Sequence, residues 1–319
     1  MPLPDAIADL LDVQCGVLSR AQALAGGLAP HDIRRMVRRR ELSTVHDGVY
    51  VDHTGQLSWQ QRAWAAVLAV APAALCHRSA IRAVRGPGWR DHDDSAAIHV
   101  AVARERRSLV APDGVVLHYL ADLASKTNWN TSPPRVRIEH AVLDVAAEAA
   151  DDLTSIAAVA DAVQGRLTTP ERMGTALASR SRIPRREFLR AVLTDVADGA
   201  CSALEHGYLT LVERPHGLPT AERQVRESVR GTIYRDVRYA AYGVDLELDG
   251  RLFHDDARAR NADLARDLAS ATSGRQSVRL GWGQVFGSAC HTAEAVGSLL
   301  QRGGWVGPVR PCPACDLAA

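Results

Sequence analysis

Lysine is nearly absent from this chain of 319 residues, in which Lys126 is the only one. Arginine therefore carries almost all of the positive charge, and the Arg and Ala codons of a GC-rich genome are the simplest explanation for this bias. The formal net charge is +1, so no global attraction to nucleic acid is expected. Any contact with nucleic acid must come from a local basic patch.

Long apolar runs and a dense set of cysteines are missing as well. The longest apolar run, residues 63–76, is too short to span a bilayer and contains Pro72. The opening MPLPDAIADLLD has no basic stretch before an apolar segment, so no secretory signal is predicted. Six widely spaced cysteines suit a reducing compartment rather than a disulfide framework. We therefore expect a cytoplasmic globular protein with no membrane partner.

The first 50 residues predict three helices followed by a β-hairpin. After a first amphipathic helix, Ser19 fits the N-cap of a second one, which Gly26-Gly27 ends. Pro30 then opens a third helix over residues 30–41, at the first-turn position that proline tolerates. Residues 42–50 alternate in polarity and contain Asp47-Gly48, a hairpin-turn signal. This order of elements is that of a winged helix.

An arginine cluster occupies the third of these helices. Ile33, Met36 and Val37 form its buried stripe, and four arginines fall on the exposed side: Arg34, Arg35, Arg38 and Arg39. In helix-turn-helix folds this helix enters the major groove of DNA, where arginine contacts phosphates or guanine edges. A solvated face is the alternative, because the first 50 residues hold six basic and six acidic side chains. Both interpretations stay open at this point.

The N-terminal motifs resemble a known family. The segment Gly16-Val17-Leu18-Ser19-Arg20-Ala21-Gln22, the arginine helix and Gly48-Val49-Tyr50 resemble the N-terminal domain of AbiEi-type antitoxins over about residues 5–52. The resemblance implies a winged-helix fold that binds double-stranded DNA, with a toxin or another protein as a further partner. His77-Arg78-Ser79-Ala80 and Leu143-Asp144-Val145-Ala146 are weakly similar to the second domain of the same group, which implies no chemistry.

The rest of the chain predicts an α/β middle region and a second α/β domain. A long buried helix is expected over residues 59–76, strands over 97–104 and 115–119 on either side of Pro112-Asp113-Gly114, and helices from 136 to 198. From residue 200 the pattern changes to a helix (203–212), two strands (232–239 and 243–249), a charged helix (256–271), a strand (276–280) and a closing helix (292–301). This order implies a mixed sheet with flanking helices.

The strongest chemical signal is the acidic strand Val244-Asp245-Leu246-Glu247-Leu248-Asp249-Gly250. Strand alternation places Asp245, Glu247 and Asp249 on one face, and such a row of carboxylates needs solvent, cations or a metal. A hairpin with the preceding strand would set Asp236 beside Glu247. Asp236, Glu247 and Asp249 are therefore predicted to bind Mg²⁺, or Mn²⁺ in its place, which activates water and stabilises charge on a phosphate. A plain turn at Asp249-Gly250 and a solvent-facing strand edge are the alternative.

The acidic strand resembles a nuclease motif. Asp236, ten intervening residues and Glu247-x-Asp249 have the spacing of the PD-(D/E)xK nuclease core, except that Asp249 stands where a lysine normally closes the motif. Glu247, Asp249, Gly250 and His254 match the Glu-x-Asp-Gly…His pattern of domains related to very-short-patch-repair endonucleases. The departure from the lysine pattern leaves open whether catalysis is retained.

This second resemblance covers about residues 200–305 and implies a restriction-endonuclease-like fold. It also implies roles for individual residues: Glu205, Asp236, Glu247, Asp249 and His254 as catalytic groups, with His254 a general acid or base. Supporting positions are Gln224, Asp263, Arg266 and Arg279, where the two arginines hold phosphate or brace the site. Ser202, Leu218-Pro219 and Trp282 extend the match. Read as ordinary residues, Asp263 and Arg266 form a helix-surface pair.

The cysteines give a weaker signal. Cys312-Pro313-Ala314-Cys315 has metal-knuckle spacing, but a structural zinc site needs four ligands. Cys290 and His291 are the nearest candidates to complete one, and with a single Cys-x-x-Cys pair a disordered tail or a loosely held pair is predicted instead of zinc. Cys15, Cys76 and Cys201 have apolar neighbours and are predicted to lie in the core.

The sequence as a whole predicts an α+β multidomain protein. The predicted parts are a winged-helix DNA-binding domain (1–55), a mixed α/β middle domain (56–198), a restriction-endonuclease-like α/β domain with a mixed sheet (199–305) and a tail (306–319). The leading hypothesis is a DNA-binding protein with a Mg²⁺-dependent endonuclease domain. The alternatives are a non-catalytic, antitoxin-like transcriptional regulator and an interaction protein whose arginine helix meets an acidic protein.

Overall fold

The computed structural model describes residues 3–87, 93–198, 202–228, 232–248, 276–313 and 315. The protein is of the mixed α+β class, with about 48% helix, 17% strand and three small sheets, one antiparallel and two mixed. The chain divides into two compact units, residues 1–145 and 146–319, and this division differs from the predicted boundaries at 55/56 and 198/199. Within the described ranges, no helix combines the length and the apolar character needed to cross a bilayer.

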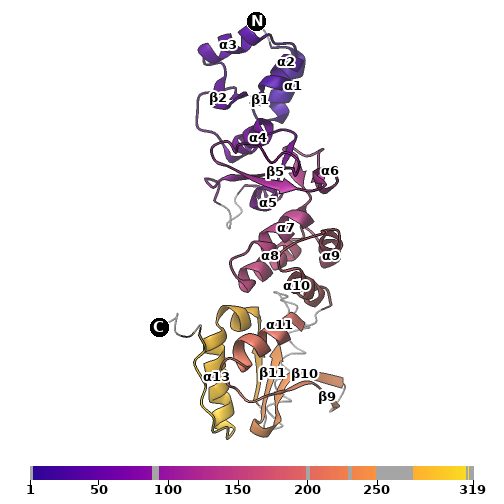
Figure 1. Cartoon of the computed structure of the whole chain (residues 1–319), viewed down its shortest axis with the longest axis vertical. Helices are drawn as coiled ribbons and strands as arrows, with labels where there is room; N and C mark the ends of the chain where they lie inside the picture. Colours follow the sequence, from indigo (N-terminus) through magenta and orange to yellow (C-terminus); the bar gives the residue numbers. More distant parts are fainter. Residues whose placement is uncertain are drawn as a thin grey trace. The chain divides into compact units, whose positions relative to one another are not determined.

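The first 51 residues form the predicted helices and hairpin, with one additional strand (Figure 1). The elements are α1 (Asp5–Val13), β1 (Val17–Ser19), α2 (Arg20–Ala25), α3 (Pro30–Arg38), β2 (Ser43–His46) and β3 (Val49–Val51). The sheet has the strand order β1-β3-β2, with antiparallel pairing throughout. The sequence analysis missed β1, because a three-residue strand carries no alternation of its own.

Local capping explains the boundaries of these short helices. The Ser19 hydroxyl accepts a hydrogen bond from the Gln22 amide at 3.1 Å, and the Gln22 side chain accepts one from the Ser19 amide at 3.0 Å. This reciprocal pair satisfies two otherwise unpaired amides at the start of α2. Gly48 adopts φ +67° at the hairpin turn, a conformation that glycine reaches without steric cost. Helix α3 ends at Arg38, earlier than predicted, and Arg40 has φ +59°.

The second half of this unit is built around a five-stranded mixed sheet of order β6-β5-β4-β8-β7. Its elements are α4 (Trp59–Ala69), β4 (Ala73–Leu75), α5 (His77–Arg85), β5 (Ile98–Ala103), β6 (Val115–Leu120), α6 (Leu123–Lys126), β7 (Thr127–Asn128), β8 (Arg135–Val136) and α7 (Ile138–Ala147). Trp64 and Ala65 of α4 pack on Val17, Val49 and Val51, so α4 covers the first sheet.

One prediction for this region was wrong. The single helix expected over residues 59–76 is instead α4 followed by β4, because Pro72 has no amide to continue the helix and the next three residues pair with β5 and β8. The strands predicted on either side of Pro112-Asp113-Gly114 are confirmed as β5 and β6, and they pair in parallel. The strand pattern indicates each strand correctly and leaves its direction of pairing undetermined.

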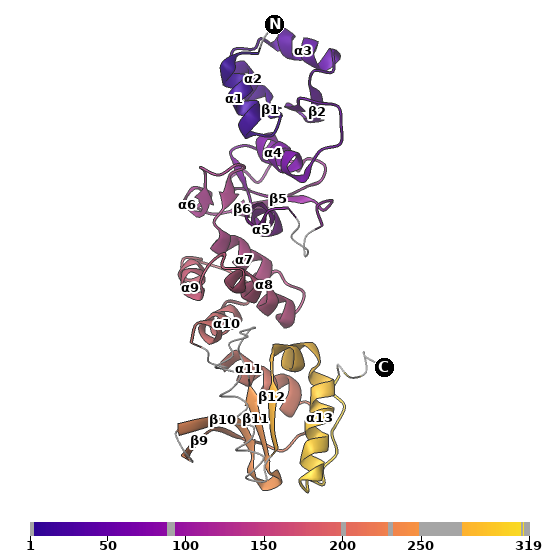
Figure 2. The same cartoon turned by 180° about the vertical axis from the view of Figure 1, so that it is seen from behind.

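The second unit begins with helices and continues into a four-stranded mixed sheet (Figures 1 and 2). Its helices before the sheet are α8 (Asp152–Gln164), α9 (Pro170–Ala178), α10 (Arg186–Asp198), α11 (Ser202–Gly207) and the π-helix η1 (Tyr208–Glu213). The later elements are β9 (Glu222–Ser228), β10 (Thr232–Tyr239), the 3-10 turn η2 (Ala240–Tyr242), β11 (Val244–Leu248), β12 (Gln276–Leu280), the π-helix η3 (Gly283–Gly287) and α13 (Ala289–Arg302).

The strand order of this sheet is β12-β11-β10-β9. Strands β9, β10 and β11 form an antiparallel meander, and β12 pairs in parallel with β11. The predicted strands at 232–239, 243–249 and 276–280 and the closing helix correspond to β10, β11, β12 and α13. Strand β9 was missed, and the predicted charged helix at 256–271 lies outside the described residues. Because β11 has neighbours on both sides, the acidic residues lie on an inner strand.

Candidate functional site

The acidic strand β11 lies between β10 and β12, and the register decides what faces its carboxylates. Arg238 of β10 is paired with Asp245, and Arg279 of β12 with Glu247. The register pairs Val237 with Leu246, so Asp236 and Glu247 are the next residues along the two strands. Asp245 itself is 2% exposed, so the solvent-facing edge considered for this strand is not what forms at that position.

The carboxylate of Asp245 is paired with an arginine of the neighbouring strand. Arg238 donates through Nε to Asp245 Oδ1 at 3.0 Å, and both side chains are buried. A buried carboxylate requires such a partner, because desolvation of an unpaired charge is strongly unfavourable. The expectation that this row of acids needs solvent or a cation is therefore met at Asp245 by the guanidinium of the neighbouring strand.

Glu247 is the one member of the predicted metal triad whose side chain the structure describes. It is half-buried, and Arg279 Nη2 donates to its Oε2 at 3.2 Å while Ser277 Oγ lies 3.5 Å from its Oε1. Of the two roles predicted for Arg279, this contact corresponds to bracing the site. Among the described side chains, the Glu247 carboxylate is therefore partly accessible, with the Arg279 guanidinium and the Ser277 hydroxyl of the parallel strand beside it.

The remaining predicted site residues fall into two groups. Glu205 is half-buried on α11, a helix that packs against η1, η3 and α10. Backbone placement is described for Asp236 on β10 and Gln224 on β9, but their side chains lie outside the described atoms. Outside the described residues altogether are Asp249, His254, Asp263 and Arg266. Only Glu247 and Arg279 are therefore brought into contact by the part of the chain that can be described.

A buried polar cluster that the sequence analysis missed lies beneath the same sheet. Tyr239 donates to Glu213 at 3.1 Å and its hydroxyl lies 2.9 Å from that of Tyr208, while Arg223 pairs with Glu213 at 2.7 Å. Burial raises the pKa of both tyrosines well above its usual range, so both stay protonated and able to donate. The cluster joins η1 to β9 and β10, and no sequence signal short of the strand register would reveal it.

The arginines of α3 lie as predicted on the side away from the core. Arg34, Arg38 and Arg39 are exposed, and Ile33 and Met36 are buried among Ile7, Leu11 and the other apolar residues of the first core. Arg35 is half-buried and pairs with Asp32 at 2.8 Å. The Ala29 amide, together with nearby cations, holds the pKa of the Asp32 carboxyl below its usual range, so this cap is charged at neutral pH.

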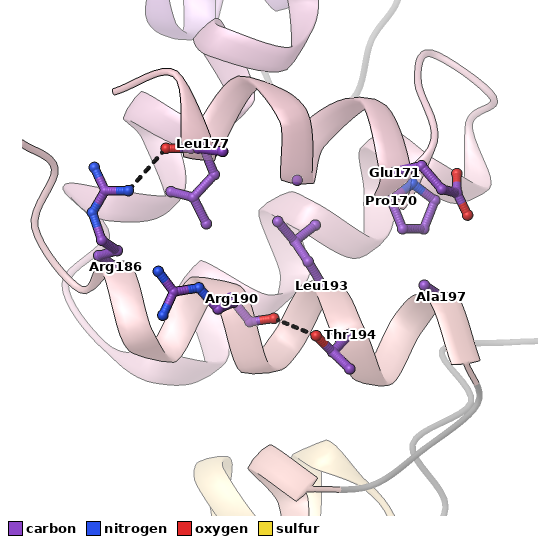
Figure 3. A pocket seen from close by; sticks show the side chains of 10 residues that line it. Pro170, Glu171, Leu177, Arg186, Arg190, Leu193, Thr194 and Ala197 are labelled. Carbon is purple, nitrogen blue, oxygen red and sulfur yellow. Dashed lines mark hydrogen bonds between the residues drawn. The ribbon is translucent and has the colours of Figure 1, made fainter. Parts of the chain in front are cut away.

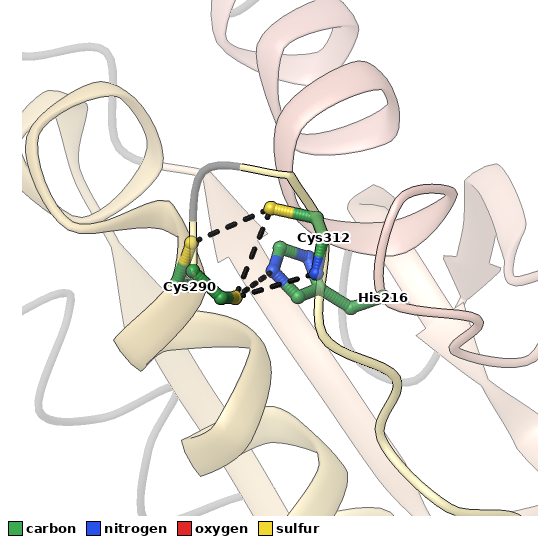
Figure 4. Close-up of side chains that lie close together, drawn as sticks. His216, Cys290 and Cys312 are labelled. Atoms are coloured by element: carbon green, nitrogen blue, oxygen red, sulfur yellow. Dashed lines mark hydrogen bonds between the residues drawn. The ribbon is translucent and has the colours of Figure 1, made fainter. Parts of the chain in front are cut away.

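Three cysteines and a histidine converge at the C-terminal end of the second unit (Figure 4). His216, Cys290, Cys312 and Cys315 each offer one donor atom, and these four atoms lie within 4.8 Å of one another. The group is a possible metal site. The cysteines are free thiols, and hydrogen bonding to Cys315, together with burial and the nearby Cys312, raises the pKa of Cys290 to about 12.

This cluster corrects the prediction for the C-terminal cysteines. Cys312 is 8% exposed and its sulfur lies 3.8 Å from that of Cys315, so the two cysteines are not a loosely held pair. Cys290 joins it as considered, but the fourth donor is His216 and not His291, whose side chain is 84% exposed. Among the other cysteines Cys76 is buried as predicted and Cys15 is exposed, and Cys201 lies outside the described residues.

A second group of potential ligands lies in the first unit, where donor atoms of Cys76, His77 and His118 lie close together. The rings of His77 and His118 are stacked with centroids 3.7 Å apart, and His99 Nδ1 lies 2.9 Å from His118 Nε2. Imidazoles that bind one metal ion direct their nitrogen lone pairs at a common point, and face-to-face stacking does not produce that arrangement. The geometry is that of a packed histidine cluster.

A cavity of about 230 Å³ lies between α9 and α10 (Figure 3). Arg186 lines it, but this side chain donates to the carbonyls of Leu177 and Arg180 and so holds the end of α9. Arg190 pairs with Glu187 on its own helix. The lining offers no converging catalytic groups, so this cavity does not compete with the acidic strand or the cysteine cluster as a candidate site.

Comparison with models of known protein families and with curated proteins finds no match for this chain. The resemblances to AbiEi-type antitoxins and to very-short-patch-repair endonucleases therefore stay predictions from the motifs.

Proposed function

We propose that this protein binds duplex DNA through a winged-helix module formed by residues 3–51. The observation that carries the proposal is the exposed arginine face of α3, directly opposite its buried face. The element order α1-β1-α2-α3-β2-β3 and the antiparallel sheet β1-β3-β2 suit a module in which α3 enters the major groove and the β2–β3 hairpin is the wing.

The distribution of charge supports the same conclusion. This part of the chain has equal numbers of acidic and basic residues, but the two kinds are unevenly distributed. Asp5, Asp9 and Asp12 lie exposed on α1, and Asp32 of α3 forms an ion pair with Arg35. Arg34 and Arg38 make no ion pair with a described residue. The positive charge is therefore local to α3, as binding to a phosphate backbone requires in a chain with almost no net charge.

Replacing Arg34 and Arg38 together by Ala is expected to weaken duplex binding without unfolding the module, because both side chains are exposed. Loss of two phosphate contacts lowers the slope of log K against log salt by about 2, which corresponds to a loss of roughly tenfold to hundredfold at 0.1 M salt. Fluorescence anisotropy of a labelled duplex at several salt concentrations measures both quantities.

A double variant Arg107→Ala/Arg302→Ala is the matched control, since it removes the same charge from exposed positions outside this module. It should leave the salt slope unchanged. Equal slopes for the wild type and the α3 variant would contradict α3 as the DNA-contacting helix. If no variant and no wild-type protein binds nucleic acid, the interaction-protein alternative gains support.

For the second unit we propose a Mg²⁺-dependent endonuclease of very-short-patch-repair type. Support comes from the mixed sheet, from the positions of Asp236 and Glu247 one residue beyond the Val237–Leu246 pair, and from Arg279 beside the Glu247 carboxylate. In this proposal Asp236, Glu247 and Asp249 supply the oxygen ligands that Mg²⁺ prefers, and the ion would provide a water nucleophile and charge stabilisation. Arg279 holds the Glu247 carboxylate in position.

Purified protein with Mg²⁺ or Mn²⁺ is expected to nick or cut duplex DNA, and Glu247→Gln to lower the rate by roughly a hundredfold or more, the scale of other charge-stabilising groups. Gel assays on intact and mismatched duplexes measure this. Glu294→Gln, on the exposed face of α13, is the matched control and should keep the wild-type rate. Equal rates for the Glu247→Gln variant and the wild type would contradict the metal assignment.

One observation favours the non-catalytic regulator as the second candidate. Arg238 and Arg279 already pair with the two carboxylates of β11 whose side chains are described. In a metal site, the bound ion would compensate the charge of such carboxylates, and arginine partners would not be needed. If no divalent metal supports cleavage while α3 still binds DNA, the second unit serves for DNA or protein binding only. The nuclease assay and the α3 variants together therefore separate the two candidates.

A further inference from the structure

The donor atoms of the cysteine cluster have the spacing of a tetrahedral metal site. Cys290 Sγ lies 3.6 Å from Cys312 Sγ, Cys312 Sγ lies 3.8 Å from Cys315 Sγ, and Cys315 Sγ lies 3.5 Å from His216 Nε2. A zinc ion with Zn–S bonds of about 2.3 Å and Zn–N bonds of about 2.0 Å separates two sulfurs by about 3.8 Å and sulfur from nitrogen by about 3.5 Å. These three edges therefore already match a tetrahedron.

The imidazole of His216 is oriented for this role. Its Nδ1 lies 2.9 Å from the Val212 carbonyl oxygen, which can only accept, so Nδ1 carries the proton and Nε2 presents its lone pair to the sulfurs. An outer hydrogen bond to a backbone carbonyl is the arrangement that fixes the tautomer of metal-binding histidines. At 1% exposure, His216 has no role on the surface.

Two further hydrogen bonds connect Cys312 and Cys315. The Cys315 amide donates to the Cys312 carbonyl at 2.9 Å, and the Cys312 amide donates to Cys315 Sγ at 3.4 Å. An amide directed at sulfur favours the thiolate, which is the form that binds a metal. Three thiolates packed together repel one another, and a divalent cation bound between them compensates their charge.

The cluster joins three distant parts of the second unit: the turn after η1, the start of α13 and the C-terminal segment. The C-terminal segment lies against the turn that carries His216, because the Arg310 amide donates a hydrogen bond to the His216 carbonyl at 2.8 Å. Gly217 has φ +64°, and a Cβ there would lie 3.0 Å from Arg310 Cδ. A Cβ on Gly297 would collide with Val309. The C-terminal segment is therefore built to lie along α13.

We propose that His216, Cys290, Cys312 and Cys315 bind one Zn²⁺ ion that fastens residues 303–315 to the rest of the second unit. The site is structural, because four protein donors leave no open position for water or substrate. Thiolate and imidazole ligands in a tetrahedron select zinc over Mg²⁺, so this ion is separate from the one proposed at the acidic strand. The inference does not depend on the proposed function.

Elemental analysis of the full-length protein is expected to find about one zinc ion per chain. Replacement by Co²⁺ should give the intense visible bands of a tetrahedral site and a thiolate-to-metal charge-transfer band in the near ultraviolet. Cys290→Ser is expected to weaken zinc binding by more than the roughly 10–100-fold that loss of an outer-shell partner costs. Removal of zinc with a chelator should accelerate chymotryptic cleavage after Trp305, whose half-buried side chain the fastened segment otherwise protects.

Two variants serve as matched controls: Cys15→Ser removes an exposed thiol, and His291→Gln removes the exposed histidine next to Cys290. Both should keep one zinc ion. His216→Cys should keep zinc and shift the Co²⁺ spectrum toward that of a four-thiolate site, which shows ligation even if Cys290→Ser fails to fold. Wild-type protein without zinc and without a tetrahedral Co²⁺ spectrum would overturn the proposal, as would a disulfide between two of the three cysteines.

Discussion

Asp245→Ala is expected to destabilise the second unit by about 3–5 kcal/mol, the cost of breaking a buried ion pair by removing one partner. The variant leaves the Arg238 guanidinium in a site where it is 8% exposed, without the carboxylate 3.0 Å from its Nε. Because β11 is an inner strand, Arg238 could reach solvent only if β10 separated from β11. The free energy of that separation is part of the expected loss of stability. Hydrogen exchange of residues 232–248, with urea denaturation, measures the change.

The double variant Arg238→Met/Asp245→Leu separates the pair's net contribution to stability from the penalty for removing one partner of a buried pair. Replacing both partners with apolar residues of similar volume is expected to restore much of the lost stability, since the desolvation of two ions then disappears. A change of less than about 0.5 kcal/mol in Asp245→Ala, the scale of ordinary surface substitutions, would mean that the pair does not stabilise this sheet.

Ile33→Ala is expected to lower the stability of the first core by about 2–5 kcal/mol, the range for removing a large buried side chain. Ile33 is 1% exposed and packs in the cluster with Ile7, Leu11 and Leu18. A cavity at this position loosens α3 from α1 and β1, so duplex binding should be lost together with protection of residues 5–51 from hydrogen exchange. The exchange of the second unit should not change, which localises the effect.

Val37→Ala is the matched control on the same helix, because Val37 packs at the edge of the cluster and is half-buried. It should cost much less than Ile33→Ala and leave DNA binding in place. If both variants lower stability equally, the buried face of α3 is not the one described. If Ile33→Ala unfolds the module yet binding persists, the DNA-contacting surface lies elsewhere in the chain.

The elements of residues 3–51 were predictable because their signals are local. Ser19 lies three residues from its capping partner Gln22, and the Asp47-Gly48 turn specifies the hairpin by itself. The middle region was harder for the same reason. A run such as Ala73–Leu75 fits either a helix or a strand, and only its pairing between β5 and β8 makes it a strand. Parallel pairing of β5 with β6 is equally invisible to alternation.

At the acidic strand, alternation indicated which carboxylates share a face but not what compensates them. Arg238 and Arg279 come from two neighbouring strands, and Glu247 lies 32 positions from its arginine. The spacing of carboxylates along one strand therefore indicated a metal site. In the structure, the register of β10, β11 and β12 places guanidinium groups beside two of these carboxylates. The residues beyond Leu248 that complete the motif lie outside the described part of the chain.

The amino-acid sequence by itself determined the mixed α+β class, the helices and hairpin of the first 51 residues and the arginine face of α3, since these depend on residues a few positions apart. Only the tertiary structure decided which cations meet the carboxylates of β11 and which histidine joins the cysteines, because His216 and Cys315 are 99 positions apart. A contact over such a separation depends on how the intervening elements pack, and no periodicity or spacing in the sequence records it.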